Sequence, residues 1–416
     1  MHATRPLQTL LVGGMLFFPS PTAGQDDIRR VSMSEALELF NRNSLALRIA
    51  RADSSAAIGS ARQTRAYPNP AFTFVREDLD RSDDDYWEST IGVTQQVEWP
   101  GRTSARRRAA THLVEGAAAT FRADSLRLAF EVREVWIRAW LAEETERTVE
   151  ETAGLIRIAA DAADRRLESG DISAFETRRL RLERVRVERD LLTARLAARA
   201  ARRTLSTLVA PGGEGAEVGP AAGPGGTPPA VAQTEAVDAL AVRPDIEAAV
   251  LNLEAARAQR DAASTGWVPD PTVSLGYKDQ ADGFSGLSFG IGLPVPLFDR
   301  RGGAHDLATA RAASAAALLD LRRREAENDV LAATERYVAV RDQLGSFGEA
   351  IMTDAEGLIE AAQTAYGEGE LTLLELLDAA RTYRDARAGA ATLRSEAWIG
   401  YYDVMRAMGR DPEEER

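Results

Sequence analysis

The chain has 416 residues, is 44% hydrophobic and 28% charged, and carries a formal net charge of −13. This length is greater than that of one ordinary domain, so a single large core is not the default expectation. The acidic balance argues against nucleic acid as a partner, because phosphates require a basic surface. The chain has no cysteine, which excludes disulfides, thiolate metal sites and a lipidated N-terminal cysteine. Its three histidines are scattered, and we therefore predict no metal site and no cofactor.

Residues 1–24 have the composition of a secretory signal peptide. Arg5 supplies the positive charge, residues 7–18 form a mainly apolar run, and small residues follow up to Gly24. A transmembrane anchor would need about 20 apolar residues, and this run is shorter. We therefore predict that residues 1–24 direct export of the rest of the chain.

The remainder of the chain contains an internal duplication. Three blocks recur in the same order and at a nearly constant offset: residues 35–70 match 235–271, 90–102 match 288–300, and 169–176 match 368–375. We therefore predict two structural repeats, at residues 25–210 and 235–410. Residues 211–234 are rich in Gly and Pro and are predicted to form a linker or surface loop without regular structure. Residues 411–416 form an acidic C-terminal tail.

Each repeat is predicted to contain a helix, a strand pair, a long helix, a turn and a returning helix, in that order. The first helix is expected over about residues 34–66, because it lacks proline until the sequence YPNP at 67–70 stops it. The long helix is expected over about residues 102–167, and at 1.5 Å per residue its length is roughly 100 Å. The remaining helices are expected at about residues 174–208, 303–366 and 373–408.

Between the helices the apolar periodicity changes from helical to two. Apolar residues alternate with small or polar ones over residues 90–99 in copy one, and over 272–277 and 288–295 in copy two. This alternation is typical of a membrane β-barrel strand, although a half-buried strand of a soluble sheet gives the same pattern. The acidic segments 76–85 and 278–283 are expected to be solvent-facing loops between strands.

The last helix shows a seven-residue repeat of apolar and small residues. One series is Leu376, Tyr383, Ala390, Ala397 and Val404, and a second is Ala379, Ala386, Leu393, Gly400 and Ala407. A seven-residue repeat predicts helices that pack along their length as a coiled coil.

Two strand pairs give one chain four strands, and this number has a geometric consequence. Known single-chain membrane barrels begin at about eight strands. If the strands face lipid, they must be combined with those of other copies, because open sheet edges are not tolerated in a membrane. Three copies would supply twelve strands, but the strand pattern alone does not fix that number.

The order of these blocks resembles the TolC family of outer-membrane efflux proteins. The resemblance rests on YPNP at 67–70, on TQQVEWPGR at 94–102 and on the Gly-Asp-Ile-Ser turn at 170–173. The first two are most similar to the CzcC-like branch, which is associated with heavy-metal efflux. Many relatives begin with a lipidated cysteine, which this chain lacks, so the barrel alone is expected to anchor it.

The resemblance implies a mainly α fold with a membrane β-barrel. A homotrimer would form a twelve-stranded β-barrel in outer-membrane lipid, on a long α-helical barrel that extends into the periplasm. It further implies two protein partners, a periplasmic adaptor (membrane fusion) protein and an inner-membrane pump, often of the proton-driven RND type.

The two helix-reversal turns are the predicted functional sites. A glycine in each turn and a following Ser or Thr suit any helical hairpin, since they end one helix and cap the next. By resemblance to the family, the turns form the tip that contacts the adaptor. The predicted contact residues are Gly170, Asp171, Ile172, Ser173, Gly369, Glu370, Leu371 and Thr372.

Four residues beside the turns are predicted to line a periplasmic aperture. Glu375 and Asp378 are three residues apart and share a helix face, so a threefold assembly would form two carboxylate rings that select cations. The alternative is a solvated face of an acidic protein. Tyr366 and Glu176 match family positions that hold the tip closed.

We therefore predict a passive exit duct of a tripartite efflux system, which exports metals or drugs and is not an enzyme. No nucleotide-binding loop and no pairing of a nucleophile with a base is present in the sequence. Two alternatives remain open at this point: the exit duct of a type I protein-secretion system, and a periplasmic adaptor. Adaptors have one hairpin beside a lipoyl-like module, whereas here both hairpin and strand pair are duplicated.

Overall fold

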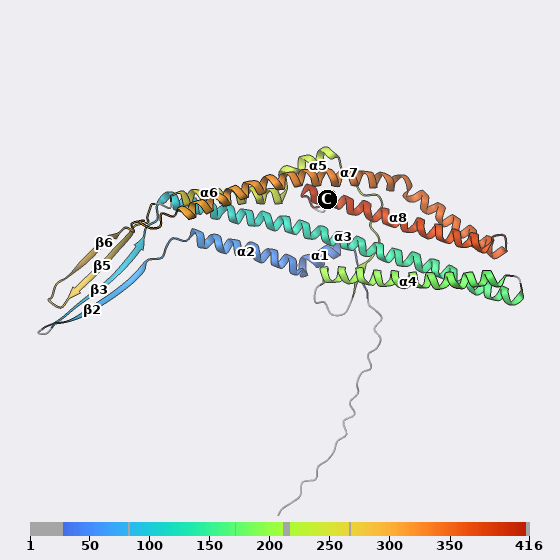
Figure 1. Cartoon of the computed structure of the whole chain (residues 1–416), viewed down its shortest axis with the longest axis horizontal. Helices are drawn as coiled ribbons and strands as arrows, with labels where there is room; N and C mark the ends of the chain where they lie inside the picture. The colour runs from blue at the N-terminus through green and yellow to red at the C-terminus, as the bar shows by residue number, and fades with distance from the viewer. Residues whose placement is uncertain (1–27, 82–83, 171, 211–216, 266–267, 413–416) are drawn as a thin grey trace, which may run out of the picture.

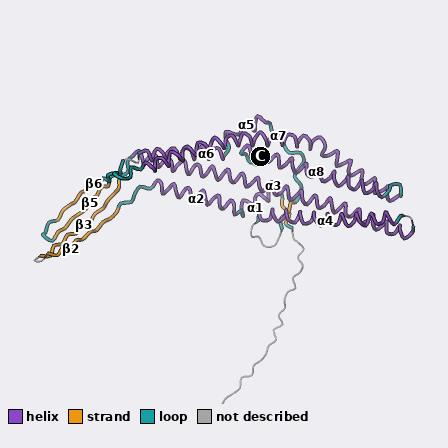
Figure 2. The backbone as a smooth tube through the Cα atoms, in the orientation of Figure 1, coloured by secondary structure: helices purple, strands orange, loops and turns teal. Residues whose placement is uncertain are grey.

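The computed structural model describes residues 28–81, 84–170, 172–210, 217–265 and 268–412. The molecule is long and narrow, with a β-sheet at one end, helical rods along its length and two helix reversals at the other end (Figures 1 and 2). The predicted signal peptide lies outside the described residues. Within them, no helix has the combination of length and apolarity that crossing a membrane requires.

The elements of copy one follow the predicted order. They are β1 (Arg29–Val31), α1 (Met33–Asn43), α2 (Leu45–Arg65), β2 (Ala71–Arg81), β3 (Asp84–Gln96), α3 (Pro100–Ser169) and α4 (Ala174–Val209). The predicted ends of the long helix and the returning helix are therefore confirmed to within about two residues.

Copy two repeats this order after a short insertion. Its elements are β4 (Val218–Pro220), α5 (Gln233–Asp238), the 3₁₀ turn η1 (Ala239–Val242), α6 (Pro244–Ser264), β5 (Thr272–Gln280), β6 (Ser285–Gly292), α7 (Gly302–Glu368) and α8 (Leu373–Met408).

Three local predictions were wrong. The first helix is divided at Ser44, whose side chain caps α2 by accepting a hydrogen bond from the Leu47 N–H. The acidic segment 76–85 is mostly strand, because β2 and β3 pair from Ala71–Thr94 to Arg81–Asp84. The Gly/Pro-rich linker contains β4, which is buried and pairs in parallel with β1.

The seven-residue repeat in α8 is confirmed as a packing seam. Leu376, Tyr383, Ala397 and Val404 are buried, and Ala390 between them is half-buried. The helices α7 and α8 form one antiparallel hairpin, α3 and α4 form the other, and α3 also packs on α8. The rods are therefore held together by small and apolar side chains along their length.

Near the middle of the rods a charged cluster joins α3, α4 and the β1–β4 pair. Glu143 on α3 is only 9% exposed and accepts hydrogen bonds from Arg30 and from Arg202, the latter at 3.2 Å. Arg202 also contacts Glu217 at 3.2 Å, beside the start of β4. Because each buried charge has a partner of opposite sign, the insertion between the copies is tied to the rods.

Candidate functional site

One face of the four-stranded sheet is apolar and exposed. The antiparallel order β2–β3–β5–β6 aligns side chains in rows across the strands. One row is Phe72, Val93, Leu275 and Phe289, and the next is Phe74, Ile91, Tyr277 and Leu287. All eight are 45% exposed or more. Apolar rows of this kind, which none of the described segments covers, suit a surface that faces lipid.

The opposite face of the sheet carries small and polar side chains. The row that alternates with the apolar ones is Thr73, Gly92, Gly276 and Ser288. Hydroxyl groups on this face donate to glycine carbonyls across the strands, from Thr272 to Gly292 at 3.3 Å and from Ser274 to Gly290 at 3.2 Å. A Cβ at either glycine would lie 2.6 Å from the opposing hydroxyl oxygen, so these strands approach closely on their polar side.

The sheet has two open edges. In the described part of the chain, β2 pairs only with β3, and β6 pairs only with β5. The N–H and C=O groups on their outer sides therefore need a partner, above all if the apolar face lies in lipid.

Below the sheet, Arg102 joins copy one to copy two. Its guanidinium lies 2.5 Å from the Asp270 carboxylate and donates to the carbonyl oxygens of Thr265 and Val268, both at 2.7 Å. Arg102 is 7% exposed and Asp270 is 8% exposed. The sequence analysis missed this pair, because the two residues are 168 positions apart and neither stands in a recognisable motif.

The two helix-reversal turns lie at the end of the molecule opposite the sheet (Figure 1). Gly170 has φ of 83° and Gly369 has φ of 82°, the left-handed conformation that glycine adopts without steric cost. Ser173 and Thr372 are the N-caps of the returning helices, as predicted. Asp171 lies outside the described residues.

The predicted contact residues at the two tips differ in their exposure to solvent. Gly170, Ser173, Gly369, Glu370 and Thr372 are exposed, as an adaptor contact requires. Ile172 and Leu371, in contrast, are half-buried against a core cluster formed by α3, α4, α7 and α8.

Glu176 and Glu375 each take part in a capping box. The Glu375 carboxylate accepts hydrogen bonds from the Thr372 hydroxyl at 2.6 Å and from the Thr372 N–H at 2.8 Å. Glu176 does the same with Ser173, at 2.9 Å and 3.2 Å. Both hydrogen bonds lower the pKa of the Glu176 and Glu375 carboxyls. The bond from the hydroxyl group contributes most, and the bond from the backbone N–H comes second. The spacing of Ser or Thr and Glu was a readable signal for this local structure.

Asp378 and Tyr366 have different surroundings. Asp378 is exposed on the same side of α8 as Glu375. The Tyr366 hydroxyl is buried and has no hydrogen-bond partner among the described residues. The predicted role of Tyr366 and Glu176 in holding the tip closed stays a prediction. Tyr366 borders an apolar groove of about 360 Å³ between the two hairpins, with Ile156, Ile359 and Leu376.

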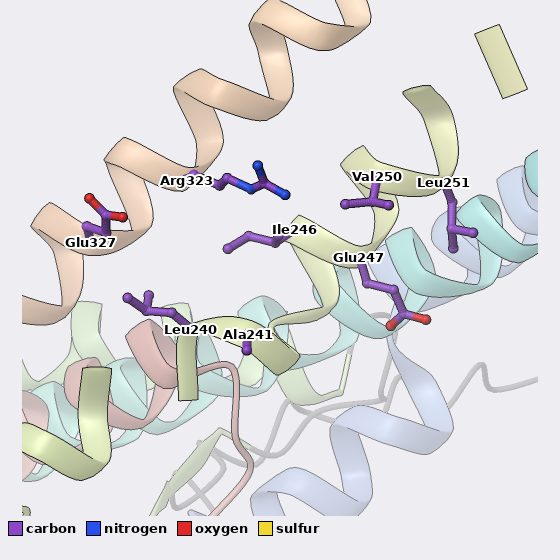
Figure 3. Close-up of a pocket in the computed structure, with 8 residues that line it drawn as sticks. All are labelled: Leu240, Ala241, Ile246, Glu247, Val250, Leu251, Arg323 and Glu327. Atoms are coloured by element: carbon purple, nitrogen blue, oxygen red, sulfur yellow. The ribbon is translucent and has the colours of Figure 1, made fainter. Parts of the chain in front are cut away.

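A second groove lies between α6 and α7, away from both the tips and the sheet. It has a volume of about 580 Å³ and an apolar wall formed by Leu240, Ile246 and Val250, with Arg323 and Glu327 on the facing helix (Figure 3). It contains none of the predicted site residues.

The sequence also matches a known family twice, once in each copy. The family described as "Outer membrane efflux protein" matches residues 36–210 and 236–410. The chain belongs to the outer membrane efflux protein family. The predicted resemblance is therefore confirmed. Members of this family are outer-membrane channels, which confirms the predicted outer-membrane location and the prediction that the protein is not an enzyme.

Several members of the outer membrane efflux family or of its fold are similar over nearly the whole chain. The cobalt-zinc-cadmium resistance protein CzcC of Cupriavidus metallidurans is 26% identical over 94% of this chain and 92% of its own length. The crystal structure of CusC, described as a transmembrane channel, has a TM-score of 0.76 at 18% identity, over 94% of this chain and 96% of CusC. A membrane protein of Pseudomonas aeruginosa has a TM-score of 0.78 at 20% identity, over 92% and 94% of the two chains. The alternative that the chain is a periplasmic adaptor is thus excluded.

Proposed function

We propose that three copies of this chain form an exit duct, with twelve strands closed into a β-barrel in the outer membrane and the helices closed into a second barrel in the periplasm. The observation that carries this proposal is the four-stranded sheet, which has an exposed apolar face and, among the described residues, two unpaired edges. Closure of the sheet with other copies satisfies both edges at once, and no partner of another kind is needed.

The oligomer is tested by the mass of the protein extracted from outer membranes in detergent. We expect a species of three chains, and planar bilayers that contain it should show steady ion conductance. A monomer in the soluble periplasmic fraction would contradict the proposal.

The helical tip is proposed to be a gate that opens when a periplasmic adaptor binds, while an inner-membrane pump of the RND type supplies the energy. Exposed turn residues together with the apolar groove beside Tyr366 offer such an adaptor polar and apolar contacts at one place. Mixed surfaces of this kind are typical of protein interfaces.

Two carboxylates are proposed to select cations at the aperture, and they are not equivalent. Asp378 is exposed and makes no cap, whereas Glu375 is held in its capping box. We therefore expect Asp378→Asn to lower the preference for cations strongly in a bilayer recording, and Glu375→Gln to lower it less, because the Glu375 carboxylate is already engaged by Thr372. If neither variant changes the reversal potential in a salt gradient, the aperture lies elsewhere.

Divalent transition-metal cations are the proposed cargo, because CzcC is named for resistance to cobalt, zinc and cadmium. Deletion of the gene should make cells sensitive to these metals, and complementation should restore growth. Sensitivity to drugs alone, or loss of one secreted protein from the medium, would instead favour drug efflux or type I protein secretion.

A further inference from the structure

A small polar pocket lies between α3 of one hairpin and α8 of the other. It is lined mainly by side chains of these two helices, which are Trp140, Glu144 and Arg147 of α3 and Arg387, Ala390 and Arg394 of α8. The three residues of α3 are three or four positions apart and share one helix face. The two arginines of α8 are seven positions apart, and the alanine between them is too short to fill the space opposite. A cavity of about 270 Å³ remains.

The guanidinium groups of this pocket outnumber the carboxylates that contact them. Glu144 contacts Arg147 at 2.5 Å and Arg387 at 3.2 Å, and Glu151 contacts Arg387 at 2.5 Å. Arg394 makes no ion pair and no hydrogen bond with any residue that the structure describes. One positive charge is therefore left without a partner, in a chain whose formal net charge is −13. Uncompensated positive charge beside a cavity attracts anions to it.

Trp140 supplies a second donor without an acceptor. Its side chain is only 7% exposed, yet its indole N–H makes no hydrogen bond within the described part of the chain. Two other tryptophans of the rods do have acceptors: Trp136 Nε1 donates to a backbone carbonyl at 3.2 Å, and Trp398 Nε1 donates to Gly225 O at 2.8 Å. Because an indole N–H in such surroundings usually has an acceptor, the pocket lacks one hydrogen-bond acceptor as well as one negative charge.

The Gly/Pro-rich segment between the two copies closes one end of the pocket. Gly223 borders the cavity and lies so close to Trp140 that a Cβ at this position would be 2.7 Å from Nε1. The same segment is fixed two residues further on, where Gly225 accepts the hydrogen bond from Trp398. Only glycine at position 223 leaves space beside the indole N–H, and such space is what close approach of a ligand requires.

We propose that this pocket binds a small oxyanion, a phosphate or a carboxylate, which is held by Arg394 and Trp140 and attracted by Arg147 and Arg387. A guanidinium group offers parallel N–H donors that match the oxygens of either group. The indole N–H adds one donor from the other helix. The site lies within one chain, so the inference does not depend on how many chains form the proposed duct.

A bound oxyanion joins the two hairpins. Trp140 belongs to α3 of copy one and Arg394 to α8 of copy two, so an ion between them adds a contact that neither hairpin forms alone. A ligand stabilises the arrangement that binds it over arrangements that do not. Binding of the oxyanion therefore opposes separation of the two hairpins at this level of the rods.

Isothermal titration calorimetry of the full chain in detergent tests the pocket. Sodium phosphate and sodium succinate are the probes, each titrated at an ionic strength held constant with sodium chloride, so that general screening of charge does not differ between samples. We expect saturable binding of about one ion per chain. Arg394→Gln should raise the Kd by about tenfold or more, because a charge-assisted hydrogen bond is lost. Binding of phosphate alone or of succinate alone would assign the site to that ion, and binding of both would assign it to oxyanions in general.

Arg384→Gln is the matched control, since it removes the same charge from the same helix outside the pocket, where Arg384 pairs with Asp385 at 3.1 Å. It should leave the Kd unchanged. Arg394→Gln leaves no carboxylate unpaired, so this variant is expected to fold like the wild type.

Gly223→Ala tests the pocket without any change of charge. Its Cβ crowds the Trp140 indole N–H and should also raise the Kd. The inference is overturned if neither probe binds saturably, or if Arg384→Gln weakens binding as much as Arg394→Gln does.

Discussion

The long helices α3 and α7 are counterparts in the duplication, yet they are buried to very different extents. α3 packs on α2, α4, α6 and α8 and has buried residues all along its 70 residues. α7 has one buried stripe, with Ala312, Leu319 and Ala326 at seven-residue spacing and Val330, Tyr337 and Leu344 continuing it. Its other side exposes Leu307, Leu318, Leu331 and Val338.

This difference in burial follows the packing partners of the two helices. The helix α3 lies between elements of its own copy, α2 and α4, and elements of copy two, α6 and α8, whereas α7 packs chiefly on elements of its own copy. The exposed side of α7 is therefore the face on which the proposed trimer would place copy one of the next subunit. Corresponding substitutions in the two copies can therefore be compared by their effect on stability. Equal effects indicate a role in local structure, and unequal effects indicate different surroundings in the two copies.

The largest expected inequality is between Arg102 and Arg300. Replacement of Arg102 by Ala leaves the Asp270 carboxylate buried without its cation, which should lower the free energy of unfolding by about 3–5 kcal/mol. Arg300→Ala removes an exposed side chain and should change unfolding of the separated subunit by no more than about 0.5 kcal/mol. Denaturant unfolding in detergent, followed by tryptophan fluorescence, measures the free energy of unfolding of both variants. Equal losses would show that the surroundings of Arg102 and Arg300 do not differ.

An equal effect in both copies is expected at the turn glycines. Gly170→Ala and Gly369→Ala should each cost about 1–2 kcal/mol, because a Cβ in the left-handed conformation meets its own backbone. A Cβ at either position meets no other atom within 4 Å, so the cost is conformational and not a clash with neighbours. Gly389→Ala is the matched control: it also has free space, but it lies inside α8 and should stabilise the helix by about 0.5–1 kcal/mol. Unequal losses at the two turns would mean that the hairpins are not equivalent.

The sequence predicts the rods and their turns well because their signals are local. The seven-residue spacing along α8, the glycine at each reversal and the Ser or Thr after it are all readable within one or two turns of helix. The helix break at Ser44, the strand β4 and the strand residues at 76–81 were missed for a different reason. Each depends on pairing or capping that the tertiary structure selects, such as β1 for β4 and the β3 partner for residues 76–81.

The candidate site was also predictable only where its signals are local. The positions of the two tips followed from the turns, but the side-chain partners of Glu176 and Glu375 did not follow from the family resemblance, which suggested pore-lining or latching roles. The contact of Arg102 with Asp270 and Thr265 could not be predicted at all, since both partners come from the other copy.

A smaller effect, again equal in both copies, is expected from the helix caps. Ser173→Ala and Thr372→Ala each remove a hydroxyl that accepts the N–H of Glu176 or Glu375, so each should cost about 1 kcal/mol. Replacement by Asn or Asp, which also cap, should restore most of the loss, whereas a purely steric role would not be rescued in this way. Hydrogen exchange of the first turn of α4 and α8 is the measurement.

The smallest expected effect is a dependence of the tips on acidic pH. The pKa of Glu375 lies below its ordinary value of 4.5 in the folded hairpin, because the carboxylate accepts hydrogen bonds from the Thr372 hydroxyl and N–H. A depressed folded pKa stabilises the fold fully above the unfolded pKa, and this contribution is lost as the pH falls through the folded pKa. The protection factors of the amides at the start of α8, which are corrected for the intrinsic pH dependence of amide exchange, should therefore fall when the pH is lowered below about 4.5 and stay constant above it. Glu375→Gln should remove this dependence while the corresponding change at Glu176 in α4 remains. A dependence that persists in the Gln variant would assign it to other groups, such as the exposed Asp378.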